Sequence, residues 1–292
     1  MDISVVVPTY NRIAELRYVL PSLLAQDLQA ERYEVIVADS NSTDGTAEYL
    51  ATFASARLRH IPGKYGGRAA ARNAGIGAAR GRIVMFNDSD IIASGDLLSR
   101  HLARHEQQRC AVVGLEVQVK SYDEYLSKSR TPPERDTLHP PNRKRLSWLY
   151  FLTGNASVRK ADLDAVGGFD ESFTGYGHED LELGYRLMEL GVPIVYESKA
   201  INYHLQDVGV VDQMSKMELA GRSTVRFYRK HPAFAVKLRL GMTPVSLGAH
   251  SLLERAPAVR RWLERASATS PLARTIAYQY HYVSGIKAAL SE

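Results

Sequence analysis

The sequence predicts an α/β protein with an open, mostly parallel β-sheet and helices on both of its faces. Apolar runs typical of strands buried on both faces occur at Ile3–Val7, Val35–Ala38 and Ile83–Phe86, and Leu58–Ile61 is predicted to be a further short strand. Segments with apolar residues at helical spacing lie between these runs. Because strands and helices alternate at short intervals, we expect crossover connections and therefore parallel strands.

The composition is that of a globular protein with a sizeable core. The chain has 292 residues, enough for one or two domains, of which 45% are hydrophobic and 24% charged. Its one cysteine, Cys110, excludes an intramolecular disulfide and fits a reducing compartment. The first residues read as a strand rather than a signal peptide, and no apolar run reaches the roughly 18 residues of a membrane span. We therefore expect a cytoplasmic protein.

In the first half of the chain, each predicted strand ends in polar residues and leads into a helix. The segment PTYN, residues 8–11, ends the first strand, and Asp39 ends the second. Gly66-Gly67 opens an alanine-rich helix at residues 69–79. Since ligands of such sheets bind beyond the carboxyl ends of the strands, we expect these polar groups to converge on one crevice.

The second half of the chain is less regular. Its predicted elements are strands at residues 111–119 and 192–196 and helices at residues 178–189 and 214–229. Residues 121–147 are polar and rich in proline, and we expect a loop or flap there. From Pro232 onward the pattern predicts amphipathic helices, broken near Pro257 and Pro271.

Two carboxylates one residue apart, Asp88 and Asp90, follow the buried run of the fourth strand. Carboxylates so close together repel each other unless a cation lies beside them, and oxygen ligands of this kind suit Mg²⁺ or Mn²⁺. Such an ion can bridge the protein to a diphosphate and neutralise the charge of a leaving group. The alternative is a polar turn whose side chains satisfy local backbone groups.

Three further groups of residues are candidates for catalysis or ligand binding. A helix begins after Gly67, which has no side chain to keep a ligand away from the backbone. Its N-terminus attracts anions, and Arg68 and Arg72 lie on one face of it. This segment is therefore suited to binding an anion. Glu179 and Asp180 open a helix, where acids also cap and offset the helix dipole. His204 is a lone histidine, a residue type more often packed than ligating. The first strand ends in PTYN and not Gly-x-Gly, which argues against a dehydrogenase.

Basic residues gather late in the sequence. The net charge is +5, and beyond residue 231 eight lysines and arginines face three glutamates. Such a surface attracts phosphates, nucleic acid or an anionic membrane, or is simply a solvated helical face. We expect no nucleic acid, because the arginines are not interleaved with a clear aromatic platform.

Together, these segments resemble the family 2 glycosyltransferases of GT-A fold. The resemblance covers residues 3–230 and rests on VVVPTYNR, VIVADSNSTDGT, GGRAAARNAGIGAARGRIVMFNDSD and TGNASVRKADLDAVGGFDESFTGYGHEDLELGYRLMELG, with the later His204. It implies a Rossmann-like sheet in a domain of residues 1–230, with a nucleotide-binding half (1–110) and an acceptor-binding half (111–230). Residues 231–292 form a basic helical extension outside the resemblance.

The resemblance also implies an activity. It is the metal-dependent, inverting transfer of a sugar from a nucleotide sugar, most often UDP-linked, to a glycan, lipid-linked or other hydroxyl acceptor. Asp180 would be the general base, with Glu179 positioning the sugar or acceptor. Asp90 would ligate Mn²⁺ or Mg²⁺ with His204, and Asp88 would hold the ribose or sugar directly or through the ion. The remaining donor-binding positions are Pro8, Thr9, Tyr10, Asn11, Asp39, Gly67, Arg68, Arg72, Gly154 and Asn155.

Several alternatives stay open at the level of sequence. Asp-x-Asp and a late histidine also serve retaining transferases of the same fold. A sugar nucleotidyltransferase usually has a glycine-rich basic loop after its first strand, which PTYN does not supply. A non-catalytic module would use the basic C-terminal helices. Ser40-Asn41 also depart from the commonest family pattern after Asp39, which weakens the assignment of the base. The C-terminal helices are candidates for peripheral contact with the inner membrane face or for a homodimer contact.

Overall fold

The computed structural model of the chain describes residues 1–53, 55–131 and 145–292, which form two units. Unit 1 comprises Met1–Ser172 and Glu179–Asp207, and unit 2 comprises Phe173–His178 and Val208–Glu292. Unit 2 therefore begins upstream of residue 231, where the sequence pattern places the start of the basic extension.

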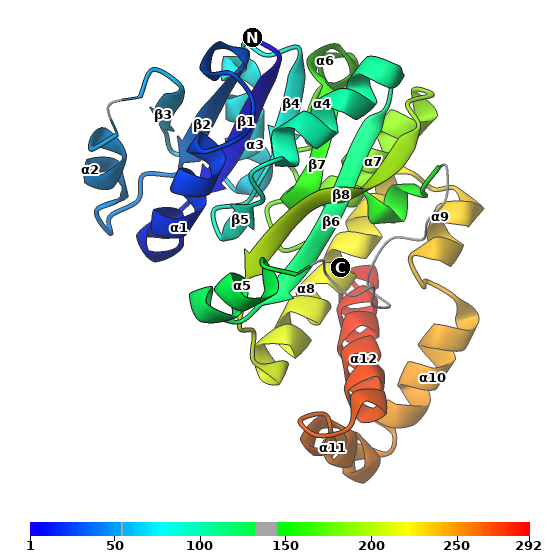
Figure 1. Cartoon of the computed structure of the whole chain (residues 1–292). Helices are drawn as coiled ribbons and strands as arrows, with labels where there is room; N and C mark the ends of the chain where they lie inside the picture. Colours follow the sequence, from blue (N-terminus) through cyan, green and yellow to red (C-terminus); the bar gives the residue numbers. More distant parts are fainter. Residues whose placement is uncertain (54, 132–144) are drawn as a thin grey trace. The chain divides into compact units, whose positions relative to one another are not determined.

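Unit 1 is built on a mixed sheet (Figure 1) in which the described strands run in the order β3-β2-β1-β4-β7-β6-β8-β5. The strands are β1 (Ile3–Thr9), β2 (Tyr33–Asp39), β3 (Leu58–Pro62), β4 (Ile83–Phe86), β5 (Ile91–Ala93), β6 (Ala111–Val119), β7 (Ala156–Arg159) and β8 (Ile194–Leu205). The α-helices are α1 (Ile13–Leu24), α2 (Thr46–Ala51), α3 (Arg68–Ala78), α4 (Leu97–Gln107), α5 (Tyr122–Lys128), α6 (Lys160–Val166) and α7 (Glu179–Glu189).

The first half of the sheet is parallel, as predicted. β1 pairs in parallel with β2 and β4, and β2 pairs in parallel with β3. In the second half, β6 and β8 are parallel, whereas β7 is antiparallel to β4 and β6, and β5 is antiparallel to β8. A strand buried on both faces shows the same apolar run in either direction, so the sequence pattern did not reveal these antiparallel pairs.

Helices cover both faces of the sheet, as predicted. Val5 and Val7 of β1 belong to one core cluster with Leu16 of α1. Val6 points to the opposite face, where α3 packs so closely that a Cβ on Gly75 would lie 2.2 Å from a Val6 methyl carbon. Because side chains alternate along a strand, β1 contributes to the core on both sides of the sheet.

Several elements differ from the sequence prediction. The short strands β5 and β7 and the helix α6 were not predicted, and β8 extends to Leu205 instead of ending near residue 196. The expected loop at residues 121–147 begins with α5, whose first turn is capped by the Ser121 side chain accepting a hydrogen bond from the Glu124 backbone N–H. Residues 132–144 of that loop lie outside the described residues.

Unit 2 is helical in its described elements. They are α8 (Val210–Lys230), α9 (Phe234–Arg239), α10 (Pro244–Glu254), α11 (Pro257–Ala266) and α12 (Pro271–Leu290). The predicted breaks at Pro257 and Pro271 are helix starts, positions where a missing N–H costs nothing. Among the described helices, none is both long and apolar enough to cross a membrane.

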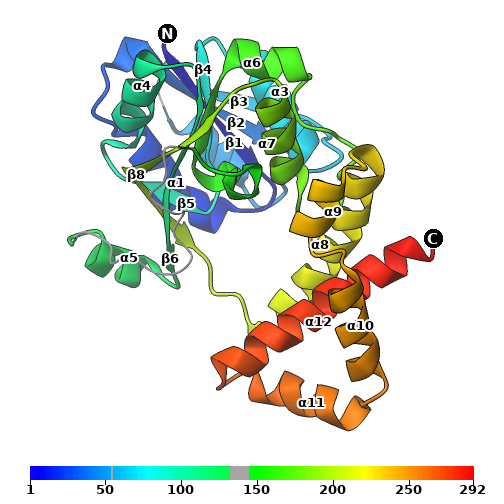
Figure 2. The same ribbon diagram turned by 90° about the vertical axis from the view of Figure 1, so that its right-hand side faces the viewer.

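The helices α8 and α12 cross at very short range, as Figure 2 shows for unit 2. A Cβ on Gly221 of α8 would lie 2.0 Å from the Tyr282 carbonyl oxygen, and one on Gly285 of α12 would lie 1.9 Å from the Glu218 carbonyl oxygen. Glycine at these two positions therefore permits the contact that holds the unit together.

Candidate functional site

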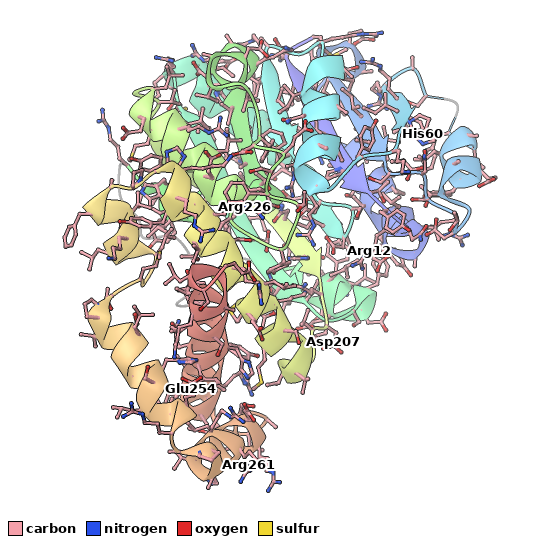
Figure 3. All side chains as sticks on the ribbon, turned by 180° about the vertical axis from the view of Figure 1, so that it is seen from behind. Arg12, His60, Asp207, Arg226, Glu254 and Arg261 are labelled. Carbon is pink, nitrogen blue, oxygen red and sulfur yellow. The ribbon has the colours of Figure 1, made fainter. Side chains whose placement is uncertain are left out.

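The carboxyl ends of β1 and β2 bring Thr9 and Asp39 side by side, as paired positions of the parallel ladder. Asp39 is buried, and its Oδ1 accepts hydrogen bonds from the Ser42 backbone N–H (3.0 Å) and hydroxyl (2.5 Å). Its other oxygen lies 3.3 Å from Nε2 of His60 on β3 (Figure 3). The buried Thr9 hydroxyl finds no hydrogen-bond partner in the described part of the chain. This edge therefore combines a fixed carboxylate with an unsatisfied polar group.

The residues around Thr9 shape the same edge. Pro8 is buried within β1, and Tyr10 is exposed just beyond it. Asn11 adopts φ 51°, a left-handed conformation that asparagine tolerates. Its Oδ1 accepts a hydrogen bond from the Thr43 backbone N–H at 2.8 Å, and its own N–H donates to the Ser42 hydroxyl at 2.8 Å. Asn11 thus fixes the loop after β2 against the end of β1.

Arg72 is the centre of a buried ionic cluster. It lies one helical turn after Arg68, the exposed first residue of α3 that follows Gly67. One guanidinium nitrogen of Arg72 donates to Asp88 at 2.8 Å, and the other terminal nitrogen donates to Glu179 at 3.1 Å. With only 2% of Arg72 exposed, its role here is to hold two carboxylates. The Nε of Arg72 and the Oε2 of Glu179 have no hydrogen-bond partner among the described residues.

The pKa values of two carboxyl groups in this cluster are shifted in opposite directions. Burial alone would raise the pKa of Asp88, but the neighbouring Arg72 outweighs it and the pKa is lowered. Burial, followed by the adjacent Glu179 charge, raises the pKa of Asp180 to about 7, because the opposing effect of Arg72 is smaller. Asp180 can therefore gain and lose a proton near neutral pH, as a general base requires.

The short strand β5 brings His204 beside Asp90. Ile91 of β5 pairs with His204 of β8, and the Leu205 N–H donates to the Asp90 carbonyl oxygen at 2.8 Å. The Nε2 of His204 lies 3.5 Å from Asp90 Oδ1, and its Nδ1 lies 3.0 Å from Glu116 Oε1. The fold thus joins two residues more than a hundred positions apart in the chain.

Two carboxylates dominate the electrostatics around His204. Burial would lower the pKa of His204, but the Asp90 and Glu116 carboxylates outweigh it and raise that pKa to about 10. Within the described residues, no group of three or more His, Cys, Asp or Glu is arranged to hold a metal ion alone. Asp90 and His204 are candidate ligands for Mg²⁺ or Mn²⁺, with His204 giving up its proton to the solvent, because such ions commonly complete their coordination with substrate phosphates and water.

Gly154 and Asn155 are both buried but have different neighbours. A Cβ on Gly154 would lie 2.3 Å from Glu116 Oε2 and 2.8 Å from Ile91 Cδ1, so a larger residue here would displace the Glu116 carboxylate. The Asn155 side chain is used inside unit 1: its amide N–H₂ donates to the Leu115 and Ala200 carbonyls, and its oxygen lies 2.9 Å from His101 Nε2. The Asn155 side chain therefore does not join the ionic cluster.

Sequence reasoning missed Glu116 and His60. Glu116 is the one acidic residue of β6, AVVGLEVQV, and its charge in an otherwise apolar segment was the available signal. The pairing of β6 with β8 and of β8 with β5, which places Glu116 near His204, is a long-range contact without a local signature.

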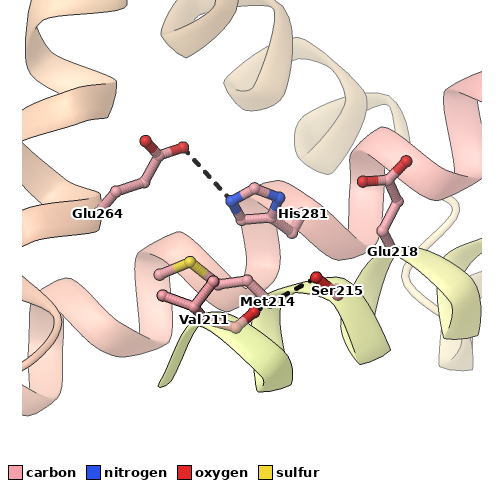
Figure 4. A pocket seen from close by; sticks show the side chains of 6 residues that line it. All are labelled: Val211, Met214, Ser215, Glu218, Glu264 and His281. Carbon is pink, nitrogen blue, oxygen red and sulfur yellow. Dashed lines mark hydrogen bonds and ion pairs between the residues drawn. The ribbon is translucent and has the colours of Figure 1, made fainter. Parts of the chain in front are cut away.

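A separate hollow of about 310 Å³ lies within unit 2 (Figure 4). Its lining residues are Val211, Met214, Ser215, Glu218, Glu264 and His281. Across it, His281 Nε2 lies 3.4 Å from Glu264 Oε1. These residues are distinct from the sequence-predicted site, which lies in unit 1.

Comparison with known proteins gives consistent matches. The family described as Glycosyl transferase family 2 matches residues 4–167, and the N-terminal domain of galactosyltransferase matches residues 137–206. Validoxylamine A glucosyltransferase of Streptomyces hygroscopicus subsp. jinggangensis is 31% identical over 82% of this chain and 64% of its own length. Chondroitin synthase of Escherichia coli is 27% identical over 78% of this chain and 39% of its own length. The chain thus spans less than two thirds of the length of these curated relatives.

Solved structures share the fold. The structure of S. aureus TarS 1-349 in complex with UDP is 19% identical, with a TM-score of 0.59 over 100% of this chain and 92% of that one. The mannosyltransferase PcManGT from Pyrobaculum calidifontis, in complex with GDP-Man and Mn²⁺, is 19% identical, with a TM-score of 0.66 over 99% of this chain and 86% of that one. These likenesses confirm the predicted α/β fold of GT-A type. With a family match over more than half of its length, the chain belongs to glycosyltransferase family 2.

Proposed function

We propose that the protein transfers a sugar, with inversion and with the help of a divalent cation, from a nucleoside-diphosphate sugar to a hydroxyl acceptor. The observation that carries this proposal is the pair of acidic groups on either side of Ser89. Asp88 is held by Arg72 together with Glu179, next to Asp180, and Asp90 faces His204. In this proposal, the end of β4 would supply the cation ligand Asp90 and, through Asp88 and Glu179, would adjoin the general base Asp180.

The donor would be a UDP-sugar bound at the ends of β1 and β2. The unsatisfied Thr9 hydroxyl and the fixed Asp39 carboxylate are suited to the donor and acceptor groups of a base. The exposed Arg68 at the start of α3 is suited to a diphosphate. Two solved neighbours, bound to UDP and to GDP-Man, support a nucleotide donor without selecting the base.

Asp90 and His204 would hold Mn²⁺ or Mg²⁺, in line with the Mn²⁺ in the PcManGT structure. When bound, the ion would neutralise the negative charge that builds on the departing diphosphate. Glu116 accepts a hydrogen bond from His204 at Nδ1, which leaves Nε2 turned to Asp90. A carboxylate behind a ligating histidine fixes its tautomer and orientation.

Asp180 would take the proton of the acceptor. As the acceptor oxygen bonds to the anomeric carbon, the bond from that carbon to the diphosphate oxygen breaks, and the hydroxyl proton passes to Asp180. In-line attack opposite the diphosphate inverts the anomeric configuration. Relatives named as a glucosyltransferase and as chondroitin synthases support a glycan or glycoconjugate acceptor.

A panel of nucleotide sugars tests this proposal. We expect one donor class to raise the melting temperature in the presence of Mn²⁺ and to release nucleoside diphosphate when acceptor alcohols are added. NMR of the product is expected to show the opposite anomeric configuration to the donor. Retained configuration would refute inversion, and the absence of any nucleotide-sugar binding would refute the function.

A further inference from the structure

Three successive helices of unit 2, α9–α11, expose large apolar side chains. We call this set the apolar face. It consists of Phe234 (78% exposed), Leu238 (54%), Val245 (80%), Leu252 (69%), Val259 (49%) and Trp262 (63%). Large apolar side chains that are exposed singly are ordinary on a soluble protein, but six of them on three successive helices indicate a surface that meets something else.

The apolar face follows helical spacing. Phe234 and Leu238 lie one turn apart on α9, and Val245 and Leu252 lie two turns apart on α10. The buried side of α10 includes a polar residue: His250 stacks on Tyr280 at 4.5 Å and hydrogen-bonds to Ser284 at 2.8 Å. Val245 and Leu252 are therefore left exposed to solvent, while a histidine of the same helix is buried.

Arginines surround the outer part of this face. On α11, Arg261 and Arg265 are exposed on the same side as Trp262, and Arg255 follows the last turn of α10. Arg261 is labelled on α11 in Figure 3, which also labels Glu254 of α10. Among the described residues, no ion pair involves any of these three arginines. Their charges are therefore available to an anionic partner.

The positive charge of unit 2 favours an anionic partner. Unit 2 contains thirteen lysines and arginines against five acidic residues, a formal charge of +8, whereas the rest of the chain sums to −3. A second copy presenting the same face would be repelled, because like charges across an interface are unfavourable. An anionic bilayer offers both negative headgroups and an apolar interior.

We infer that the apolar face of α9–α11 docks on a surface of anionic phospholipid. The helices would lie in the interface plane, with Trp262 and its apolar neighbours at the boundary of the acyl chains and the arginines at the phosphates. Each basic residue near such a surface strengthens binding by a factor of about five. The inference goes beyond the transfer reaction and does not depend on it.

Vesicle binding of the full chain tests this inference without donor or acceptor. We expect the protein to co-sediment with vesicles of phosphatidylcholine and phosphatidylglycerol, weakly or not at all with phosphatidylcholine alone, and less at high salt. The triple variant R255Q/R261Q/R265Q should bind about 100-fold more weakly. The variant V259S/W262S should also lose binding, whereas L219S, which removes a 46% exposed leucine from α8, should bind like the wild type.

Tryptophan fluorescence provides a second measurement that needs no destabilising change. The chain has two tryptophans, and Trp148 is buried in unit 1, so a blue shift on adding anionic vesicles would report Trp262. This shift should be absent in W262F. Equal binding to neutral and anionic vesicles, no binding at all, or a protein dimer that V259S/W262S dissociates in the absence of vesicle binding would each overturn the inference.

Discussion

Arg72 is the residue around which the acidic groups of unit 1 are organised. A buried charge is costly unless it is paired, and Arg72 pairs with both Asp88 and Glu179. The guanidinium thereby keeps Asp88 ionised. It does not do the same for Asp180, whose raised pKa reflects burial and the charge of Glu179. Neighbouring carboxylates with different pKa values are a common basis for different catalytic roles.

Asp180→Asn tests the role of the general base. We expect transfer to fall about 100-fold or more while donor binding is retained, because only the proton acceptor is lost. The wild-type rate should rise with pH to a plateau, with its midpoint near pH 7, because the base must be deprotonated. Kinetics across this pH range measure both effects, with the exposed Asp164→Asn as control. An undiminished turnover number in Asp180→Asn would remove Asp180 from the role.

Asp180→Asn should also make the fold more stable at alkaline pH, although it lowers the activity. The folded-state pKa of Asp180 lies above its ordinary value of 3.8, so the stability contributed by its protonated form is lost as pH rises towards about 7. At pH 8 the wild type therefore carries an unfavourable buried charge that asparagine lacks. We expect the free energy of unfolding to rise by on the order of 1 kcal/mol or more, measured in urea. A destabilised variant would contradict the raised pKa.

Glu116 is predicted to orient His204 rather than to bind substrate. Glu116→Gln should weaken Mn²⁺ binding by about 10-fold or more, because carboxylates behind ligating histidines have effects of this size. Isothermal titration of Mn²⁺ measures the affinity, and ¹⁵N NMR of the His204 ring in the Mg²⁺-bound protein measures its tautomer. Glu124→Gln on the exposed face of α5 is the matched control. Unchanged Mn²⁺ affinity and tautomer would leave Glu116 without this role.

Among the elements of the fold, the short β5 explains why apolar residues stand on both sides of the acidic segment in residues 85–92. The chain leaves β4 at Phe86, turns through Asp88 and Asp90, and re-enters the sheet at Ile91 against β8. Two buried strands thus flank an acidic turn, which holds its carboxylates at the sheet edge. The sequence pattern identified the first strand and the acids but not the second strand, since three residues are too few for periodicity.

The sequence predicted local structure better than long-range pairing. The strands Ile83–Phe86 and Ala111–Val119 were placed correctly: the first is a continuous apolar run, and the second is mostly apolar and rich in valine. The pairing of β5 with β8 was invisible, and with it the partners of His204. Of the site, the acidic residues could be predicted from motif position, whereas the bridging role of Arg72 depends on tertiary contacts.

The helices α8 and α12 cross so closely that one added methyl group, as in a glycine-to-alanine change, should disturb their packing. Gly285→Ala would place a Cβ 1.9 Å from the Glu218 carbonyl oxygen, a backbone atom that cannot move without shifting its helix. We expect a loss of roughly 1–3 kcal/mol in the stability of unit 2, measured by urea unfolding. Gly248→Ala on α10 has nothing within 4 Å of its Cβ and should be neutral or slightly stabilising. Equal stability of the two variants would contradict the close crossing.

At the scale of the whole molecule, charge is divided between the units. Unit 1 carries the acidic cluster and a net charge of −3, and unit 2 carries the basic residues and a net charge of +8. The small overall charge of +5 therefore conceals two surfaces of opposite character. Unit 1 would bind the cation and nucleotide donor, and unit 2 would bind the anionic surface.

The central claim is that Asp90 and His204 seat a divalent cation together with a nucleoside diphosphate. Electron paramagnetic resonance of Mn²⁺, titrated with protein in the presence of UDP, measures this most directly. The signal of free Mn²⁺ should fall with the wild-type protein and should remain with Asp90→Asn and His204→Ala. If both variants remove Mn²⁺ from solution as strongly as the wild type, or if UDP and GDP both leave the wild-type signal unchanged, the account is contradicted.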